Sequence, residues 1–146
     1  MDKPKRRFWL RTVLVIGAFY CTIGIAFGAF AGWSTSNRMV VGWRVASFVI
    51  SAIVFAIHIG YEHFGLANRP LIVALHASVA VALGAFGLAV GANINSIGVA
   101  SSNHRLLAAA LVIWPVMTGI PAFVVAIITA GGLHFFRRAN VSPEKS

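Results

Sequence analysis

Five polar residues share one apolar stretch of the chain, residues 43–65 (WRVASFVISAIVFAIHIGYEHFG). They are spaced by three, four, seven and four residues, and they are Arg44, Ser47, Ser51, His58 and Glu62. At about 3.6 residues per turn, this spacing places them along one stripe of a helix. Lipid does not solvate ionisable groups, so in a membrane helix such a stripe faces a bundle interior or a wet cavity. We expect any chemistry inside the membrane to lie along this stripe.

The histidines of two neighbouring predicted helices are expected at a similar depth. His58 lies six residues before Phe64, where the second helix should end, and His76 lies six residues after Pro70, where the third should begin. At about 1.5 Å per residue, both lie about 9 Å from their helix ends. Glu62 is one turn from His58, which predicts an i,i+4 hydrogen bond, with His76 capping or pairing nearby.

The same two histidines permit a second interpretation. Imidazoles at equal depth on neighbouring helices could bind the iron of haem b from both sides. Gly84, two turns beyond His76, would leave room for the edge of the porphyrin. Because ligand spacing between helices is variable, no sequence motif identifies such a site. On this interpretation the protein is an electron carrier that uses His58 and His76.

Proton- or cation-coupled transport is a third interpretation. Glu62 is the only acidic residue between Asp2 and Glu144, so a coupling carboxylate has to be Glu62. Histidine changes its charge near neutral pH, so His58 could take part in moving protons. Arg44, at the outer end, either completes a polar track or extends to the lipid headgroups as a structural residue. Four short helices enclose little volume, so a pathway would need a dimer or a larger assembly.

The composition is typical of a membrane protein. Of the 146 residues, 59% are hydrophobic and 10% are charged, whereas about a quarter of the residues in soluble domains are charged. The net charge is +9, and five of the twelve lysines and arginines lie in the first eleven positions. The other seven are scattered without a basic groove, so nucleic acid is not an expected partner. With Cys21 alone, there is neither a disulfide framework nor a thiolate metal motif.

Four apolar runs predict an all-α fold, an integral membrane bundle of four transmembrane helices. A membrane span needs about 20 apolar residues. The expected helices cover residues 9–32, 42–64, 70–93 and 105–136. They form a single domain over residues 1–138, followed by a disordered tail at 139–146. The first run is longer than the apolar core of a signal peptide, so we expect it to remain as a helix.

Basic residues predict the orientation of the bundle. With both termini in the cytoplasm, nine lysines and arginines lie inside and three outside, as the positive-inside rule requires. The outer three are Arg38, Arg44 and Arg105. We therefore expect a multi-pass protein of the plasma or cell inner membrane. Its partners are the lipid bilayer and either a second copy or a larger membrane protein.

Small residues predict where the helices pack. Glycines spaced by four let the backbone of a second helix approach closely. The expected contact positions on the first and third helices are Gly24, Gly28, Gly32, Gly84 and Gly91.

The fourth apolar run is too long for a straight span. Its 32 residues would extend about 48 Å, against a hydrocarbon core of about 30 Å. A kink or local unwinding is expected at Pro115 and Pro121.

The sequence carries no catalytic signature. It lacks HExxH, GxSxG, a pair of carboxylates and the phosphate-binding pattern GxxxxGK[ST]. We expect a non-enzymatic membrane component without a cofactor, either an accessory subunit or a simple transporter-like bundle. The alternative is the haem b carrier.

Overall fold

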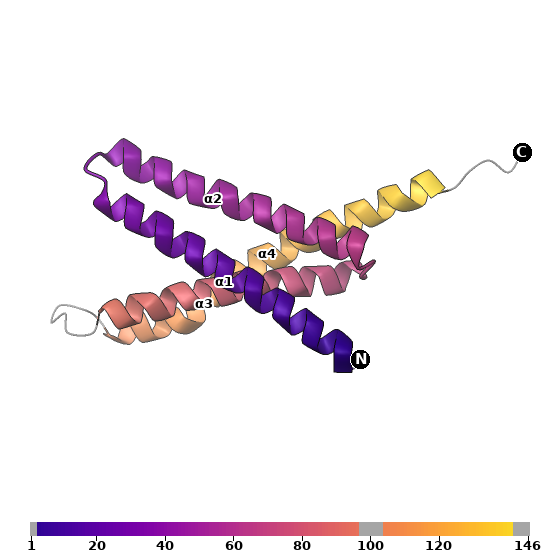
Figure 1. The fold of residues 1–146 in the computed structure, drawn as a ribbon, viewed down its shortest axis with the longest axis horizontal. Coiled ribbons are helices and arrows are strands. Elements are labelled where there is room, and N and C mark those ends of the chain that lie inside the picture. The colour runs from indigo at the N-terminus through magenta and orange to yellow at the C-terminus, as the bar shows by residue number, and fades with distance from the viewer. Residues whose placement is uncertain (1–2, 97–103, 142–146) are drawn as a thin grey trace, which may run out of the picture.

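Four long helices make up the part of the chain that the computed structural model describes, residues 3–96 and 104–141 (Figure 1). They are α1 (Lys3–Trp33), α2 (Asn37–Gly60), α3 (Pro70–Asn95) and α4 (His104–Val141). A π-helical turn, η1 (Tyr61–Gly65), continues α2. No strand occurs in these ranges, and all four helices are long and apolar enough to cross a membrane. The predicted all-α fold, with four helices long and apolar enough to span a membrane, is confirmed.

The helices are longer than the sequence predicted. Because α2 begins at Asn37 instead of residue 42, only residues 34–36 connect it to α1. The expected disordered tail at 139–146 is helical as far as Val141, and its remaining residues lie outside the described part of the chain. At the start of α3, Pro70 lies where predicted, because its fixed φ and missing N–H suit the first turn of a helix.

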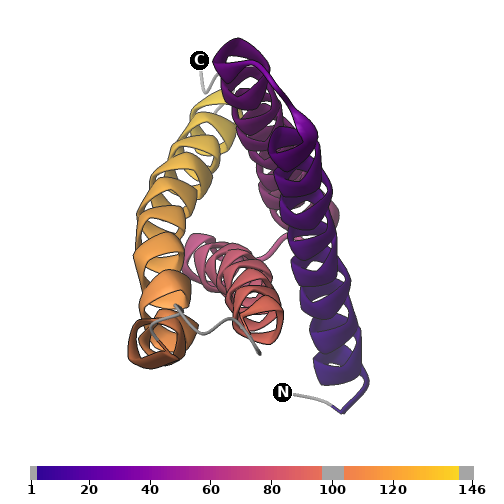
Figure 2. The same cartoon turned by 90° about the vertical axis from the view of Figure 1, so that its left-hand side faces the viewer.

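The central helix of the bundle is α3. It packs most extensively on α4 and next on α1, whereas α2 packs mainly on α1. In Figure 2, α1 and α2 form one side, α4 forms the other, and α3 lies between them. Alanines dominate the buried contacts of α3, with Ala74 and Ala77 facing α4 and Ala80 facing α1. Such small side chains let the helix backbones approach closely.

Glycines permit the close contact between α1 and α3. A Cβ on Gly84 would lie 2.6 Å from Tyr20 Cβ, and one on Gly24 would lie 2.6 Å from Leu88 Cδ1. Gly17 faces α3 in the same way, because a Cβ on this residue would lie 3.0 Å from Leu83 Cβ.

The other glycines expected at helix contacts face open space. A Cβ on Gly28, Gly32 or Gly91 would have no neighbouring atom within 4 Å in the described part of the chain. The helices of a single chain therefore do not use these three positions for close packing.

Both prolines of α4 lie inside a continuous helix. Neither Pro115 nor Pro121 interrupts it, so the local unwinding expected there does not occur. Thr118 Oγ1 donates to the carbonyl of Trp114 at 2.9 Å and is 3.3 Å from that of Pro115. These bonds support the turn between the prolines, which lack the N–H that continues a helical hydrogen-bond ladder.

The glycine contact predicts opposite effects for two equivalent substitutions on α3. We expect Gly84→Ala to destabilise the protein by about 1–3 kcal/mol, because the new methyl group would overlap the backbone-proximal Cβ of Tyr20. Gly91→Ala should be neutral or stabilise by up to about 1 kcal/mol, because alanine favours a helix and the site is open. Equilibrium unfolding in detergent measures both. Equal stability of the two variants would contradict the assigned contact.

Candidate functional site

Glu62 is the centre of the polar site. It lies in η1 and only 1% of the residue is exposed. Asn68 Nδ2 donates to Glu62 Oε2 at 2.6 Å. His76 Nδ1, on α3, lies 2.8 Å from Oε1 and 3.0 Å from Oε2. Because an ionised carboxylate only accepts hydrogen bonds, the bond to His76 requires a proton, carried either by Nδ1 or by the carboxyl group.

His58 approaches the same carboxylate less closely. Its Nε2 lies 3.6 Å from Glu62 Oε1, and the residue is 3% exposed. This distance is just beyond a hydrogen bond, and neither ring nitrogen has a hydrogen-bond partner within the described chain. The distance between His58 and Glu62 is therefore longer than the predicted hydrogen bond requires. His76 makes the direct contact with the carboxylate.

The π-helical turn and the loop after it hold Glu62 in place. The N–H of Leu66 donates to the carbonyl of Tyr61, the wider i→i−5 bond of a π-turn, at 3.2 Å. Asn68 donates through its backbone N–H to the carbonyl of Glu62 at 3.2 Å, in addition to its side-chain bond. Ala67 has a φ of 50°, so the chain turns back sharply at this point. The loop residue Asn68 thereby binds Glu62 twice.

An aromatic ring from α1 completes the site. The Trp9 and His76 rings lie 5.1 Å apart between centroids, tilted by 43°. Three segments, α1, η1 and α3, therefore meet around the carboxylate. The sequence analysis did not identify Trp9 or Asn68 as members of the site. The signal for Asn68 was an amide in the short loop after the only intramembrane acid, whereas nothing in the sequence connects Trp9 with His76.

The polar stripe predicted along α2 divides into separate parts. Arg44 is exposed and lies 18 residues before Glu62, or about 27 Å along the helix. It does not join the site. Ser47 and Ser51, between them, face a cavity instead.

A second pair of histidines lies beside the site. His63, in η1, is 2% exposed, and its ring lies 6.3 Å from that of His134 on α4, measured between centroids. The pair connects η1 to α4. Within the described residues, no group of three or more His, Cys, Asp or Glu side chains is arranged to hold a metal ion.

The positions of His58 and His76 do not suit a haem. Axial ligands direct one nitrogen each at the iron from opposite faces of the porphyrin. Here His58 Nε2 and His76 Nδ1 both face Glu62 Oε1, at 3.6 and 2.8 Å, so the carboxylate occupies the position that the iron would need. The geometry supports a carboxylate–imidazole cluster rather than a bis-histidine site.

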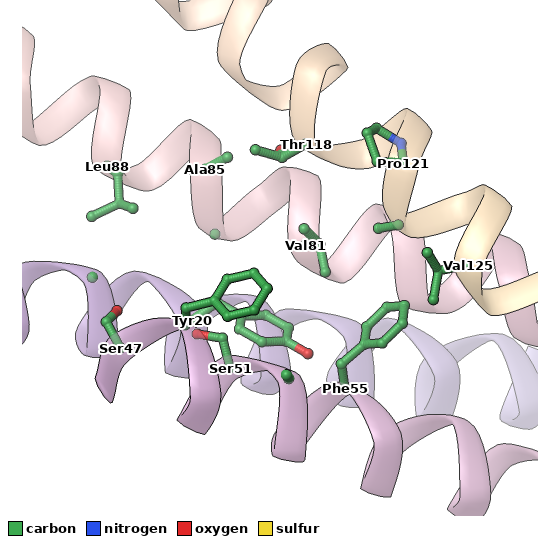
Figure 3. A pocket seen from close by; sticks show the side chains of 15 residues that line it. Tyr20, Ser47, Ser51, Phe55, Val81, Ala85, Leu88, Thr118, Pro121 and Val125 are labelled. Atoms are coloured by element: carbon green, nitrogen blue, oxygen red, sulfur yellow. The ribbon is translucent and has the colours of Figure 1, made fainter. Parts of the chain in front are cut away.

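A cavity of 590 Å³ lies further along the bundle and is lined by residues of all four helices (Figure 3). Tyr20 contributes from α1, Ser51 and Phe55 from α2, Ala85 from α3 and Val125 from α4. Because Phe55 lies three residues before His58, the cavity ends about one helical turn from the polar site.

No protein-family model matches the chain, and neither a curated protein nor a solved structure matches it.

The pairing of Glu62 with His76 predicts energetic coupling between them. We expect Glu62→Gln and His76→Ala to show a coupling of about 0.5–3 kcal/mol in a double-mutant cycle, because the two side chains make direct contact. Unfolding of the four proteins in detergent gives this value.

Thr129→Val provides the control for this cycle. Thr129 is exposed and bonds only its own helix, through Val125. Combined with Glu62→Gln, it should be additive within about 0.5 kcal/mol. If the changes in unfolding free energy caused by the Glu62 and His76 substitutions are additive, the contact between the two side chains does not contribute to stability.

Proposed function

We propose that this chain is a multi-pass membrane protein that acts as a small transporter-like bundle, with Glu62 as its proton-binding group. The observation that carries the proposal is the burial of Glu62 against His76 and Asn68, with His58 near. An ionisable residue within a membrane span is costly and marks proton or ion pathways. Here the carboxylate lies close to two imidazole rings, which can exchange a proton with it.

The cluster has two kinds of proton site. The short bond between Glu62 and His76 holds one proton, and His58 Nε2 offers a second site 3.6 Å from the same oxygen.

Asn68 gives this cluster a connection to the surface. Its side chain is partly exposed, and it donates directly to Glu62 Oε2. Leu66, Ala67 and Arg69, in the same loop, are exposed. Release of the Asn68 bond would free the carboxylate oxygen on the side of this exposed loop.

The proposed orientation places this loop in the cytoplasm. Arg69 lies in the loop between α2 and α3, on the same side as the basic start of α1 and the Arg137-Arg138 pair near the end of α4. Basic residues favour the cytoplasmic side of a membrane. We infer a cell-membrane protein in which the Glu62 cluster lies near the cytoplasmic surface.

An accessory role is the second candidate function, and the exposure of α2 favours it. None of the most apolar window of α2 and η1 is buried within the chain. Phe48 is 75% exposed and Ile57 is 65% exposed on this helix. A larger membrane protein or a second copy could cover this surface. Purification in mild detergent should then recover a stoichiometric membrane partner or an oligomer, and repeated recovery of a lone monomer would contradict this role.

Removing the carboxylate should abolish proton movement. In liposomes with an imposed pH gradient and an internal pH-sensitive dye, the wild-type protein should accelerate the decay of the gradient. Glu62→Gln should reduce this rate to that of empty liposomes, because the side chain keeps its size but loses its titrating group.

The other acidic residues supply the matched control for this flux. The double variant Asp2→Asn, Glu144→Gln removes every other side-chain carboxyl group in the chain and should retain wild-type flux. Flux through Glu62→Gln at the wild-type rate, or wild-type flux no faster than that of empty liposomes, would contradict the proposal.

The orientation predicts where reporters are active. A fluorescent protein that folds only in the cytoplasm should be bright when fused after α4 or inserted at Ala67, an exposed loop residue. The same reporter inserted at Thr35, between α1 and α2, should be dark. The reverse pattern would place the Glu62 cluster at the opposite face of the membrane.

A further inference from the structure

The cavity between the four helices has the size and chemistry of a ligand site. Its volume of 590 Å³ lies within the range of small-molecule pockets, about 300–1,000 Å³. Among the described residues, no lysine, arginine, histidine, aspartate or glutamate lines it. Its polar side chains all carry hydroxyl groups, and they are Tyr20, Ser47, Ser51 and Thr118. A charged ligand would find no partner here, so the occupant is uncharged and mainly apolar.

Tyr20 brings a buried polar group to this cavity. The residue is 9% exposed, and its hydroxyl has no hydrogen-bond partner among the described residues. Thr118, in contrast, donates to its own helix. The Tyr20 side chain is fixed by the packing of α1 on α3, against Gly84 and Ala80. A buried hydroxyl without a partner is unfavourable, so a hydrogen-bonding group brought into the cavity gains from pairing with it.

The wall opposite Tyr20 belongs to the least restrained helix. In Figure 3 the Tyr20 hydroxyl points towards α2, which carries Ser51 and Phe55. The contacts of α2 with α3 and α4 are far less extensive than those that α3 makes with α1 and α4. The hydroxyl oxygen itself is buried, so a ligand pairs with it after a shift of the side chains that surround it. Phe48, at this open side, is 75% exposed, which allows entry from the lipid phase.

We propose that the cavity binds an uncharged, lipid-soluble molecule through one hydroxyl or carbonyl group, which hydrogen-bonds Tyr20. Its apolar part lies against the Phe, Val, Leu and Ala side chains that α2, α3 and α4 contribute to the lining. This inference names the substrate class of the proposed transporter. Transport of the bound molecule rests on the proposed function, whereas its binding does not. Phe55 lines the cavity one turn from His58, so an occupant contacts the helix that carries the polar site.

The test uses two photoreactive probes with the protein in lipid nanodiscs. One is a diazirine-bearing long-chain alcohol, and the other is the matching alkane without the hydroxyl. We expect the alcohol to label cavity residues and to be displaced by unlabelled long-chain alcohol. Tyr20→Phe should weaken alcohol binding roughly 2- to 12-fold, the effect of one neutral hydrogen bond, and should leave alkane binding unchanged.

Two further variants control for position and folding. Tyr61→Phe changes the only other tyrosine, which is exposed in η1 outside the cavity, and should leave both probes unaffected. Ala52→Phe fills the cavity from an exposed position on α2, where the larger side chain does not disturb the core. It should reduce labelling by both probes at least fivefold.

Three outcomes would overturn this inference. Equal alcohol affinity of Tyr20→Phe and wild type excludes the hydrogen bond. Equal affinity of the wild-type protein for the two probes means that the cavity holds lipid acyl chains only. Labelling outside the cavity places the site elsewhere. The proposed function is tested separately from this inference. The Glu62→Gln variant should bind the probes whether or not it carries protons.

Discussion

The burial of one carboxylate is the constraint on which the rest of this structure depends. Glu62 is the only acidic residue between Asp2 and Glu144, and it is 1% exposed. A buried charge is tolerated only where it is paired and hydrogen-bonded. Its partners come from different segments, His76 from α3 and Asn68 from the loop that precedes it. The chain therefore brings these segments together, and the cluster stabilises the end of the bundle where α2 passes into α3.

The remainder of the bundle supports this arrangement through close packing of small residues. α3 is central, and it presents alanines to α4 and Gly84 to α1. This close packing allows Trp9 to reach His76 at one end and Tyr20 to line the cavity further along. The π-turn η1 widens the end of α2 and leads into the sharp turn at Ala67. A buried polar cluster and an open, uncharged cavity thus lie about one helical turn apart along α2.

The sequence predicted what depends on helical periodicity and chain length, and it missed what depends on the approach of separate helices. Spacing along the chain predicts the four helices, the start of α3 at Pro70 and the grouping of His58 with Glu62. Other features depend on how neighbouring helices rotate and cross. They are the closer contact of His76 with Glu62, the contact of the Trp9 ring with His76, and the open positions of Gly28 and Gly91. Many rotations bury a similar apolar area, so the sequence alone does not select one.

The measurement that tests the central claim most directly is infrared difference spectroscopy of the purified protein between acidic and neutral pH. The account predicts a protonation band from a carboxyl group in a dry environment. This band should persist in the variant that lacks both other side-chain carboxyls and disappear in Glu62→Gln. A spectrum of Glu62→Gln identical to that of the wild type would contradict the account, because Glu62 would then not exchange a proton within this range.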